Sequence, residues 1–440
     1  MMPRMFAFTL FLWNLAHTAI ASDALILKHY EVNAQNLAEL YQQFHSQPEL
    51  SGKEVLTSKR LANALKNAGC EVHEGIGGHG VVGVLKNGKG RVLMIRADMD
   101  ALPLIEKTGL AYASKVQVRD DNGNLVGVMH ACGHDINITC LAGVASVLGK
   151  MKDQWQGTIL LVGQPAEETG RGARAMLVDG LFTKFPKPDL ALALHCDGRF
   201  PSGFPSGHVN YRAGPMQANV DSVEIIIKGK GGHGAFPDKA IDPIVIAARV
   251  VRDLQFIISR ERDPLDPAVI TVGSIHGGTK HNIIPAEVKL ELTVRTVRTA
   301  SRINILSAIE RVAQAASLGA GAPEPVVRLN ASEFTPELIN DVELTTKTVK
   351  VFESLLGKDK VHERPMSLGG EDFSQFVRAG VPGFYYFLGS ADPKAVAIAK
   401  QGGNPLAVTH SDSYFPDYAT VIKTGVRTMG AAVLFHLADK

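Results

Sequence analysis

Residues 129–135, with the sequence Met-His-Ala-Cys-Gly-His-Asp, hold a thiol and an imidazole two positions apart. Cys132 and His134 flank a glycine, and a bend at this glycine lets both side chains face one point in space. Both are good ligands for a borderline-soft divalent metal ion. The pair alone does not establish a metal site, because a buried cysteine is usually an inert core residue and a histidine is often an ordinary polar one.

Acidic and imidazole side chains also follow three apolar segments that are typical of buried strands. Asp98 and Asp100 come after 92–95, Glu167 and Glu168 after 158–162, and His195 after 190–194. Open α/β sheets bind their ligands at the carboxyl ends of strands, so we expect these side chains to gather at one sheet edge. For single residues a simpler interpretation stays open. Either aspartate could cap a turn or a helix, and paired glutamates are common in a first helical turn.

Together with His410, these residues form a ligand set large enough for two divalent ions that share a bridging group. The five candidate ligands are Cys132, His134, Glu168, His195 and His410. Two ions ~3.5–4 Å apart polarise a carbonyl and lower the pKa of a shared water. Hydrolysis also needs a base that moves the water's proton to the leaving group. Glu167, adjacent to Glu168, can point away from the metals and fill that role.

The length and composition bound the class of protein. A chain of 440 residues is too long for one ordinary core and predicts two domains. Its 45% hydrophobic and 20% charged content is typical of a soluble globular protein. The net charge is +2 without a run of Lys or Arg, so we expect neither nucleic acid nor an anionic membrane as a partner. The four cysteines form no CxxC pair, which argues against a disulfide framework or a zinc ribbon.

The N-terminus has the pattern of a secretory signal peptide. Arg4 precedes an apolar stretch over 5–13, and Ala19-Ile20-Ala21 follows with small residues at the cleavage spacing. A membrane anchor is the alternative, but the stretch is short and a membrane span needs ~20 apolar residues. We therefore expect cleavage after Ala21, export to the periplasm or the medium, and no membrane attachment after cleavage.

Hydrophobic periodicity predicts the elements that position these residues. Leu37, Leu40, Tyr41 and Phe44 recur at helical spacing, and a second helix is predicted over 53–69. Strands are expected at 81–85 and 92–95, joined through Asn87-Gly88, a dipeptide typical of tight turns. Residues 116–128 have the pattern of a hairpin with a polar tip, and a helix begins near Ile138, after the Cys132 segment.

A second pattern begins after residue 218. An alternating strand at 223–227 is followed by a helix over 242–259, strands at 269–275 and 288–294, and a helix over 301–318. Such alternation predicts a small α+β module whose sheet has one exposed face, and the Gly/Pro-rich segment 319–325 is a plausible linker. We therefore predict an α/β protein with one domain at 22–218 and 326–440 and an inserted domain at 219–325.

Six blocks, spread over nearly the whole mature chain, resemble the M20 metallopeptidase and amidohydrolase family. The resemblance is greatest to its branch of hippurate hydrolases, N-acyl-amino-acid amidohydrolases and auxin-conjugate hydrolases. The blocks are RADMDALP at 96–103, MHACGHD at 129–135, QPAEE at 164–168, GKGGHGAFPD at 229–238, HNIIPAEVKLELTVRT at 281–296 and GGEDF at 369–373. Each block is a weak pattern by itself, whereas six in the family's order are specific.

The resemblance implies a fold and roles for particular residues. It implies an open mixed sheet carrying two metal ions, with 219–325 as a lid that also forms a homodimer. The residues that match the family's metal ligands are Cys132, His134, Glu168, His195 and His410, with Cys132 as the bridge. Glu167 matches the general acid/base. Asp98 and Asp100 match residues that orient the ligands. In the lid, His233, Asn282 and Arg295 match residues that stabilise the oxyanion and hold the substrate carboxylate, the histidine coming from the neighbouring subunit. Relatives usually have a histidine where this chain has Asn137, which is not a metal ligand in our interpretation.

The expected reaction is hydrolysis of the amide bond of an N-acyl or N-aroyl amino acid, a hippurate-like small molecule. Water activated by two divalent ions would attack, with Glu167 as general acid/base. Manganese or zinc suits the ligand set best, with cobalt or nickel as alternatives. A dipeptidase or carboxypeptidase using the same centre is the first alternative. A non-catalytic binding protein that retains the fold is the second, although Glu167 would then have no purpose.

Overall fold

The computed structural model describes residues 3–197 and 204–438, with side chains from residue 22 onward. The chain forms two compact units: Met1–Gly214, Asn340–Pro365 and Gln375–Lys440 make the larger, and Pro215–Ile339 with Met366–Ser374 make the smaller. The return to the larger unit therefore falls at residue 340 rather than at the predicted 326. The reason is that β15 (Val326–Leu329) pairs antiparallel with β10 (Asn219–Lys228), which extends the smaller sheet beyond the predicted linker.

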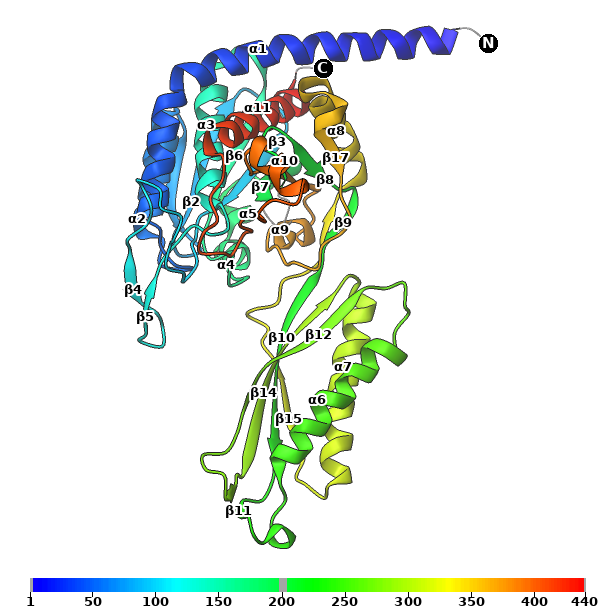
Figure 1. Ribbon diagram of the computed structural model, residues 1–440. Coiled ribbons are helices and arrows are strands. Elements are labelled where there is room, and N and C mark those ends of the chain that lie inside the picture. Colours follow the sequence, from blue (N-terminus) through cyan, green and yellow to red (C-terminus); the bar gives the residue numbers. More distant parts are fainter. Residues whose placement is uncertain (1–2, 198–203, 439–440) are drawn as a thin grey trace. The chain divides into compact units, whose positions relative to one another are not determined.

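An eight-stranded mixed sheet forms the centre of the larger unit (Figure 1). In spatial order its strands are β1 (Glu71–Ile76), β2 (Gly80–Asn87), β6 (Gly157–Gln164), β3 (Val92–Asp98), β7 (Leu190–Asp197), β18 (Gly383–Gly389), β8 (Val209–Tyr211) and β17 (Val361–Glu363). The run β6-β3-β7-β18 is parallel. Their carboxyl ends therefore lie at one edge, and β3 is the central strand that its apolar sequence predicts.

The predicted turn at Asn87-Gly88 does not join neighbouring strands. β2 runs antiparallel to β6 from Val81 opposite Gly163 to Asn87 opposite Gly157, and β3 pairs with the other edge of β6. Gly88 has the positive φ of a tight turn, but the chain then continues past β6 before β3 begins. A turn dipeptide fixes the local reversal only, whereas the order of strands depends on which apolar strand completes the sheet.

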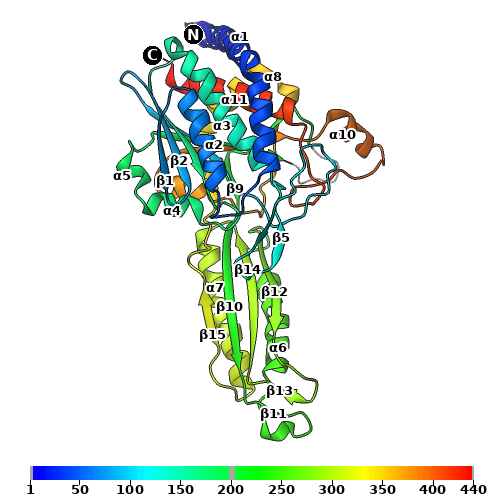
Figure 2. The ribbon, with the colours of Figure 1, turned by 90° about the vertical axis from the view of Figure 1, so that its left-hand side faces the viewer.

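Helices α1 (Pro3–Ser46), α3 (His134–Lys150), α8 (Val342–Leu356) and α11 (Tyr418–Leu437) form one layer of the larger unit (Figures 1 and 2). Their apolar faces share one core with the sheet, and Leu37, Tyr41 and Phe44 of α1 are buried there as their spacing predicts. The remaining elements of the larger unit are α2 (Val55–Asn67), the hairpin β4 (Gln117–Arg119) and β5 (Leu125–Gly127), α4 (Gly172–Val178), α5 (Leu181–Lys184) and α10 (Pro393–Lys400). The hairpin confirms the pattern at 116–128.

The smaller unit is a four-stranded antiparallel sheet with two long helices packed on it (Figure 1). The sheet order is β12 (Ala268–His276), β14 (Glu287–Thr296), β10 and β15, and the helices are α6 (Pro243–Arg260) and α7 (Thr299–Gly319). Alternate residues of β10 are buried among helix side chains, which confirms the predicted half-exposed strand. A two-stranded ribbon of β11 (Gly232–His233) and β13 (Ile283–Ile284) extends from it. Short elements β9 (Gly214–Gln217), β16 (Leu338–Asn340) and α9 (Ser374–Arg378) lie where the chain passes from one unit to the other.

The predicted signal peptide, residues 1–21, lies outside the residues whose side chains are described. The backbone of residues 3–21 belongs to α1, which continues to Ser46. Within the part of the chain that the structure describes, no helix has an apolar stretch long enough to cross a membrane.

Candidate metal centre

The loop before α3 aims Cys132 and His134 at one point. Gly133 has φ +83°, a left-handed conformation that glycine adopts without strain, and a Cβ atom there would lie only 3.0 Å from the Cβ of Cys196. His134 begins α3, and its Nδ1 donates to the carbonyl oxygen of Asp100 at 2.8 Å. The proton on Nδ1 leaves Nε2 as a free lone pair, which is the form that binds a metal ion.

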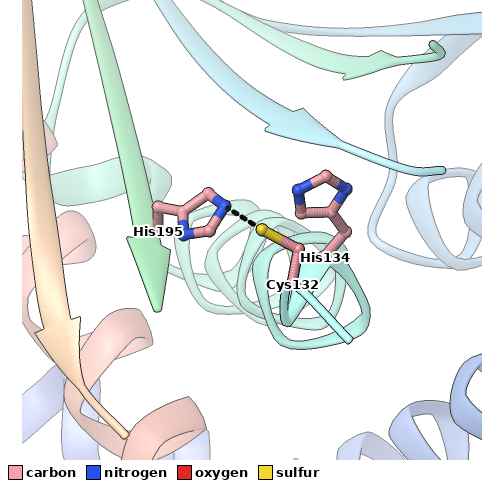
Figure 3. A group of neighbouring side chains, drawn as sticks. All are labelled: Cys132, His134 and His195. Carbon is pink, nitrogen blue, oxygen red and sulfur yellow. Dashed lines mark hydrogen bonds between the residues drawn. The ribbon is translucent and has the colours of Figure 1, made fainter. Parts of the chain in front are cut away.

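His195 reaches the same point from the end of β7. Its Nδ1 donates to the carbonyl oxygen of Cys196 at 2.7 Å, so Nε2 again carries the lone pair. Nε2 lies 3.5 Å from the sulfur of Cys132. Figure 3 shows Cys132 between His195 and His134, with the sulfur turned toward His195. Two imidazoles with fixed tautomers thus flank one thiol.

A turn after β6 brings Glu167 and Glu168 to the same place. Ala166 takes φ +51°, which is unusual for a residue with a side chain, and this conformation reverses the chain immediately after the strand. The backbone N–H groups of Glu167 and Glu168 donate to the two carboxylate oxygens of Asp100 at 3.1 and 3.0 Å. Asp100 therefore orients both the turn of the glutamates and, through its carbonyl, the ring of His134.

His410 comes from a distant part of the chain and also has a left-handed backbone, with φ +67°. Its N–H donates to the carbonyl oxygen of Ala131 at 2.8 Å, which fastens it beside Cys132. Its Nε2 lies 3.3 Å from the sulfur of Cys132 and 3.5 Å from Oε1 of Glu168. Ala166 and His410 are the positive-φ residues other than glycine in the described part of the chain, and both belong to this site.

The structure thus brings together all five candidate ligands and Glu167. Their donor atoms fall into three overlapping groups, within each of which the atoms lie within 4.8 Å of one another. The groups are Cys132 with His134 and His195, Cys132 with Glu168 and His410, and His134 with Glu167 and Glu168. Cys132 belongs to two of them, so its sulfur occupies the position that a bridging ligand would take.

The electrostatics of the cluster favour a cation. Nε2 of His134 and Oε1 of Glu168 are buried atoms without a hydrogen-bond partner, and each lies beside other potential ligands. Burial raises the pKa of the Cys132 thiol well above its usual value and the pKa of Glu168 to about 7. Both groups therefore need positive charge beside them to become good anionic ligands. The donor set and its environment fit divalent metal ions.

Asp98 lies beside His134 in a buried polar chain. Its Oδ2 accepts from Nη1 of Arg96 at 2.6 Å and lies 3.8 Å from Nε2 of His134, and its Oδ1 accepts from Nδ2 of Asn137 at 2.7 Å. Arg96 also donates through Nε to Gln164 at 2.8 Å. Asn137 therefore acts on the site through Asp98 and makes no direct contribution to the ligand groups.

The predicted lid residues lie in the smaller unit at two separate places. His233 pairs with Ile283, and the N–H of Gly234 donates to the carbonyl oxygen of Asn282 at 2.9 Å, so His233 and Asn282 are neighbours at the exposed ribbon. Nδ1 of His233 accepts from the N–H of Ala235 at 3.1 Å, which leaves Nε2 as a donor. Arg295 lies near the other end of the sheet, opposite Val220 on β10, and burial lowers its pKa. Within one chain these residues do not form a single group.

Sequence reasoning missed Glu54 and Ser51, which support the site from the segment before α2. Ser51 donates through Oγ to Asp100 at 2.6 Å, and Glu54 accepts the N–H of Ala166 at 2.8 Å. No local signal marks them, because a serine and a glutamate ahead of a helix usually indicate a cap.

Comparison with known proteins places this architecture among hydrolases. Residues 94–403 match the model of peptidase family M20/M25/M40. The chain is 37% identical over 366 residues to thermostable carboxypeptidase 1 of Saccharolobus solfataricus, and this match covers 82% of this chain and 88% of that protein. It is 38% identical over 338 residues to hippurate hydrolase of Campylobacter jejuni, with coverage of 76% and 83%. The solved structure of the Bacillus subtilis YXEP protein, described as a dinuclear metal-binding peptidase of the M20 family, is similar with a TM-score of 0.73 and 27% identity, over 92% of this chain and 99% of that one.

Proposed function

Because the chain belongs to peptidase family M20/M25/M40 and is a metal-dependent hydrolase of amide or peptide bonds, we propose that it cleaves N-acyl or N-aroyl amino acids. The observation that carries this proposal is the convergence of sulfur, nitrogen and oxygen donors around Cys132, with Glu167 beside them. A relative with hippurate hydrolase activity in its name supports the substrate class.

The centre fits two divalent ions: His134 and His195 with Cys132 would hold one, and Glu168 and His410 with Cys132 would hold the other. A relative described as dinuclear supports this number. Thiolate with imidazole suits zinc, and the carboxylate also suits manganese. When bound, the ions supply positive charge that polarises the amide carbonyl and acidifies a water molecule.

Glu167 moves the protons of the reaction. Its Oε2 lies 3.9 Å from Nε2 of His134, and its backbone is fixed on Asp100. From this position its carboxylate takes a proton from the attacking water and then delivers it to the departing amine, so both transfers use one group. Asp100 acts as a positioning residue that holds the turn of Glu167.

The smaller unit supplies the groups that recognise substrate. Arg295 offers a guanidinium that suits the free carboxylate of an amino acid, and Nε2 of His233 and the amide of Asn282 are donors for a developing oxyanion. Glu287 and Arg295 are eight positions apart on β14, or ~26 Å at ~3.3 Å per residue. The ribbon strand that pairs with His233 ends at Ile284, three positions before Glu287, so the ribbon lies at the Glu287 end of the sheet; Figure 1 shows β11 beyond that end of β14. One chain therefore cannot bring both ends of its sheet to one substrate. This supports a homodimer in which each subunit contributes His233 to the active site of the other.

The test is a panel of substrates with protein loaded with manganese or zinc. We expect turnover of hippurate and other N-acylated amino acids, loss of turnover with a chelator, and no turnover of the corresponding esters of the amino acid carboxylate. Glu167→Gln should reduce kcat by roughly 10²–10⁴-fold with metal content unchanged, because it loses its proton-transfer group. Wild-type turnover in this variant would remove Glu167 from its role, and metal-loaded protein that binds but cleaves no amide would favour the non-catalytic alternative.

A carboxypeptidase is the second candidate, supported by the 37% identity to thermostable carboxypeptidase 1. The same panel separates the two functions when it includes peptides of increasing length. An amidohydrolase of acylated amino acids should prefer hippurate over dipeptides and tripeptides with the same C-terminal residue. Faster cleavage of the peptides would establish the carboxypeptidase.

We also propose that the protein is exported and loses residues 1–21. The charged residue, apolar stretch and small residues of this segment support it. N-terminal sequencing of protein from the periplasm or medium of a bacterial host should begin at Ser22; intact protein confined to the cytoplasm would contradict export.

A further inference from the structure

Three successive backbone N–H groups at the turn after β6 are held by two acidic side chains. Ala166 donates to Oε1 of Glu54 at 2.8 Å, Glu167 to Oδ1 of Asp100 at 3.1 Å, and Glu168 to Oδ2 of Asp100 at 3.0 Å. The turn carries both the proposed acid/base and a proposed metal ligand. The geometry of the turn therefore depends on both carboxyl groups. Asp100 already has a role as a positioning residue, whereas Glu54 has none in the reaction described above.

The side chain of Glu54 is fixed in the protein interior. Its side chain is fully buried, and Oε1 also accepts the N–H of Gly52 at 2.8 Å, while Oε2 has no hydrogen-bond partner. Ser51 from the same segment donates to Asp100 at 2.6 Å. The segment before α2 thus contacts Asp100 through Ser51 and the turn of the two glutamates through Glu54.

Capping of α2 does not explain Glu54. Its side chain makes no capping hydrogen bond, although it occupies the N-cap position. Glu49 caps the helix instead, because its Oε2 accepts hydrogen bonds from the N–H groups of Leu56 and Thr57, each at 2.8 Å. The two glutamates lie five positions apart in one segment but serve different partners.

The contact with Ala166 has a structural purpose at a strained residue. A non-glycine residue is strained in the left-handed region, so Ala166 keeps φ +51° only where its surroundings impose it. The hydrogen bond from its N–H to Glu54 is fixed in direction, and the acceptor side chain of Glu54 is buried. If it is lost, the turn can relax toward an ordinary conformation and carry Glu167 and Glu168 away from the centre.

We propose that Glu54 is a positioning residue that holds the Ala166 turn so that Glu167 and Glu168 face the metal centre. This inference rests on the proposed function for the role of Glu167, but not for the position of Glu168. The group acts as a hydrogen-bond acceptor. Burial and the neighbouring Asp100 raise the pKa of Glu54 to about 7, so a neutral group of the same shape can replace it.

The experiment compares four variants for metal affinity, measured by competition with a chromophoric chelator for manganese or zinc, and for kcat and KM on hippurate. Glu54→Leu removes the acceptor without leaving a large cavity, and Glu54→Asp keeps a carboxylate that is too short to reach Ala166. Both should lose ~10–100-fold in metal affinity and kcat, with a smaller change in KM. Glu54→Gln keeps Oε1 and should retain both within about threefold of the wild type, and the matched control Glu49→Gln should do the same.

Wild-type metal affinity and kcat in a folded Glu54→Asp protein would overturn the proposal, and so would a Glu54→Gln protein as impaired as Glu54→Asp. The aspartate variant decides the matter if Glu54→Leu does not fold. A third outcome separates the two proposals. If the Glu54 variants change metal affinity as expected but the wild-type protein cleaves no acylated amino acid, the positioning role is supported and only the proposed substrate is refuted.

Discussion

Asn137 shows how one side chain outside the ligand groups can control the centre. It donates to Asp98, whose other oxygen accepts from Arg96 and faces His134. Burial alone would raise the pKa of Asp98, but His134 in its protonated form, the charge of Arg96 and the hydrogen bond from Asn137 hold it well below its usual range. Asp98 therefore stays ionised beside Nε2 of His134, where its negative charge favours a cation at the centre.

Replacement of Asn137 by alanine should weaken the centre. Asp98 would lose a buried hydrogen bond, which costs about 1–3 kcal/mol in the free energy of unfolding, and a displaced Asp98 should lower metal affinity ~10-fold or more. Denaturant unfolding and chelator competition measure the two effects. Asn137→His is the control, because an imidazole N–H can donate in place of the amide; equal loss in both variants would contradict this role.

At the scale of elements, His45 fastens the end of α1 to the start of α3. Its Nδ1 lies 2.7 Å from Oδ2 of Asp135, and its Nε2 lies 3.1 Å from Oε1 of Glu106 on the loop before the hairpin. Burial lowers the pKa of His45, but the hydrogen bonds and charges of Asp135 and Glu106 outweigh it and raise the pKa to about 9. The folded protein therefore holds His45 as a cation between two buried carboxylates.

Stability should depend on pH through this histidine. Because its folded pKa is raised from 6.5 to about 9, its contribution is complete below pH 6.5 and is lost as the pH rises through 9. The wild type should exceed His45→Gln in free energy of unfolding at pH 6, by at most roughly 3 kcal/mol, and the difference should shrink by pH 9.5. Denaturant unfolding over this range measures it. The half-exposed His73 serves as the control in His73→Gln; a difference that grows with pH would contradict the assignment.

The sequence predicted the parts of the centre that follow from strand ends. Apolar segments that end in Asp98, Glu167 or His195 could be placed at one sheet edge, because the carboxyl ends of parallel strands coincide. Glu54 could not be found in this way, since its partner is the N–H of Ala166, and only the folded chain brings them together. The left-handed backbones of Ala166 and His410 were equally hidden, because neither residue type signals that conformation.

At the scale of the whole molecule, periodicity predicted two units but not where the chain leaves the second. Residues 319–325 look like a linker because they are rich in glycine and proline, yet β15 follows them and pairs with β10. An edge strand of four residues carries too little pattern to be distinguished from a connecting segment. The strand order around β6 was unpredictable for a related reason, since pairing between distant strands leaves no local signal.

The proposed homodimer predicts complementation between two inactive variants. His233→Ala and Glu167→Gln each disable every site in their own dimers. In a mixed dimer, one site combines the intact Glu167 of one subunit with the intact His233 of the other. Equal amounts that exchange subunits at random should recover about one quarter of wild-type activity. Mixing His233→Ala with His233→Asn is the control and should recover nothing; no recovery in the first mixture, with exchange verified, would place His233 in its own subunit's site.

The metal content of the folded protein tests the central claim most directly. After loading with manganese or zinc and removal of free metal, elemental analysis should find about two ions per chain, and Cys132→Ala should hold at most one because both ligand groups share that sulfur. Cys70→Ala, which removes another buried thiol outside the ligand groups, should keep the full content. A folded wild-type protein that binds no metal, or a Cys132→Ala protein that binds as much as the wild type, would contradict the account.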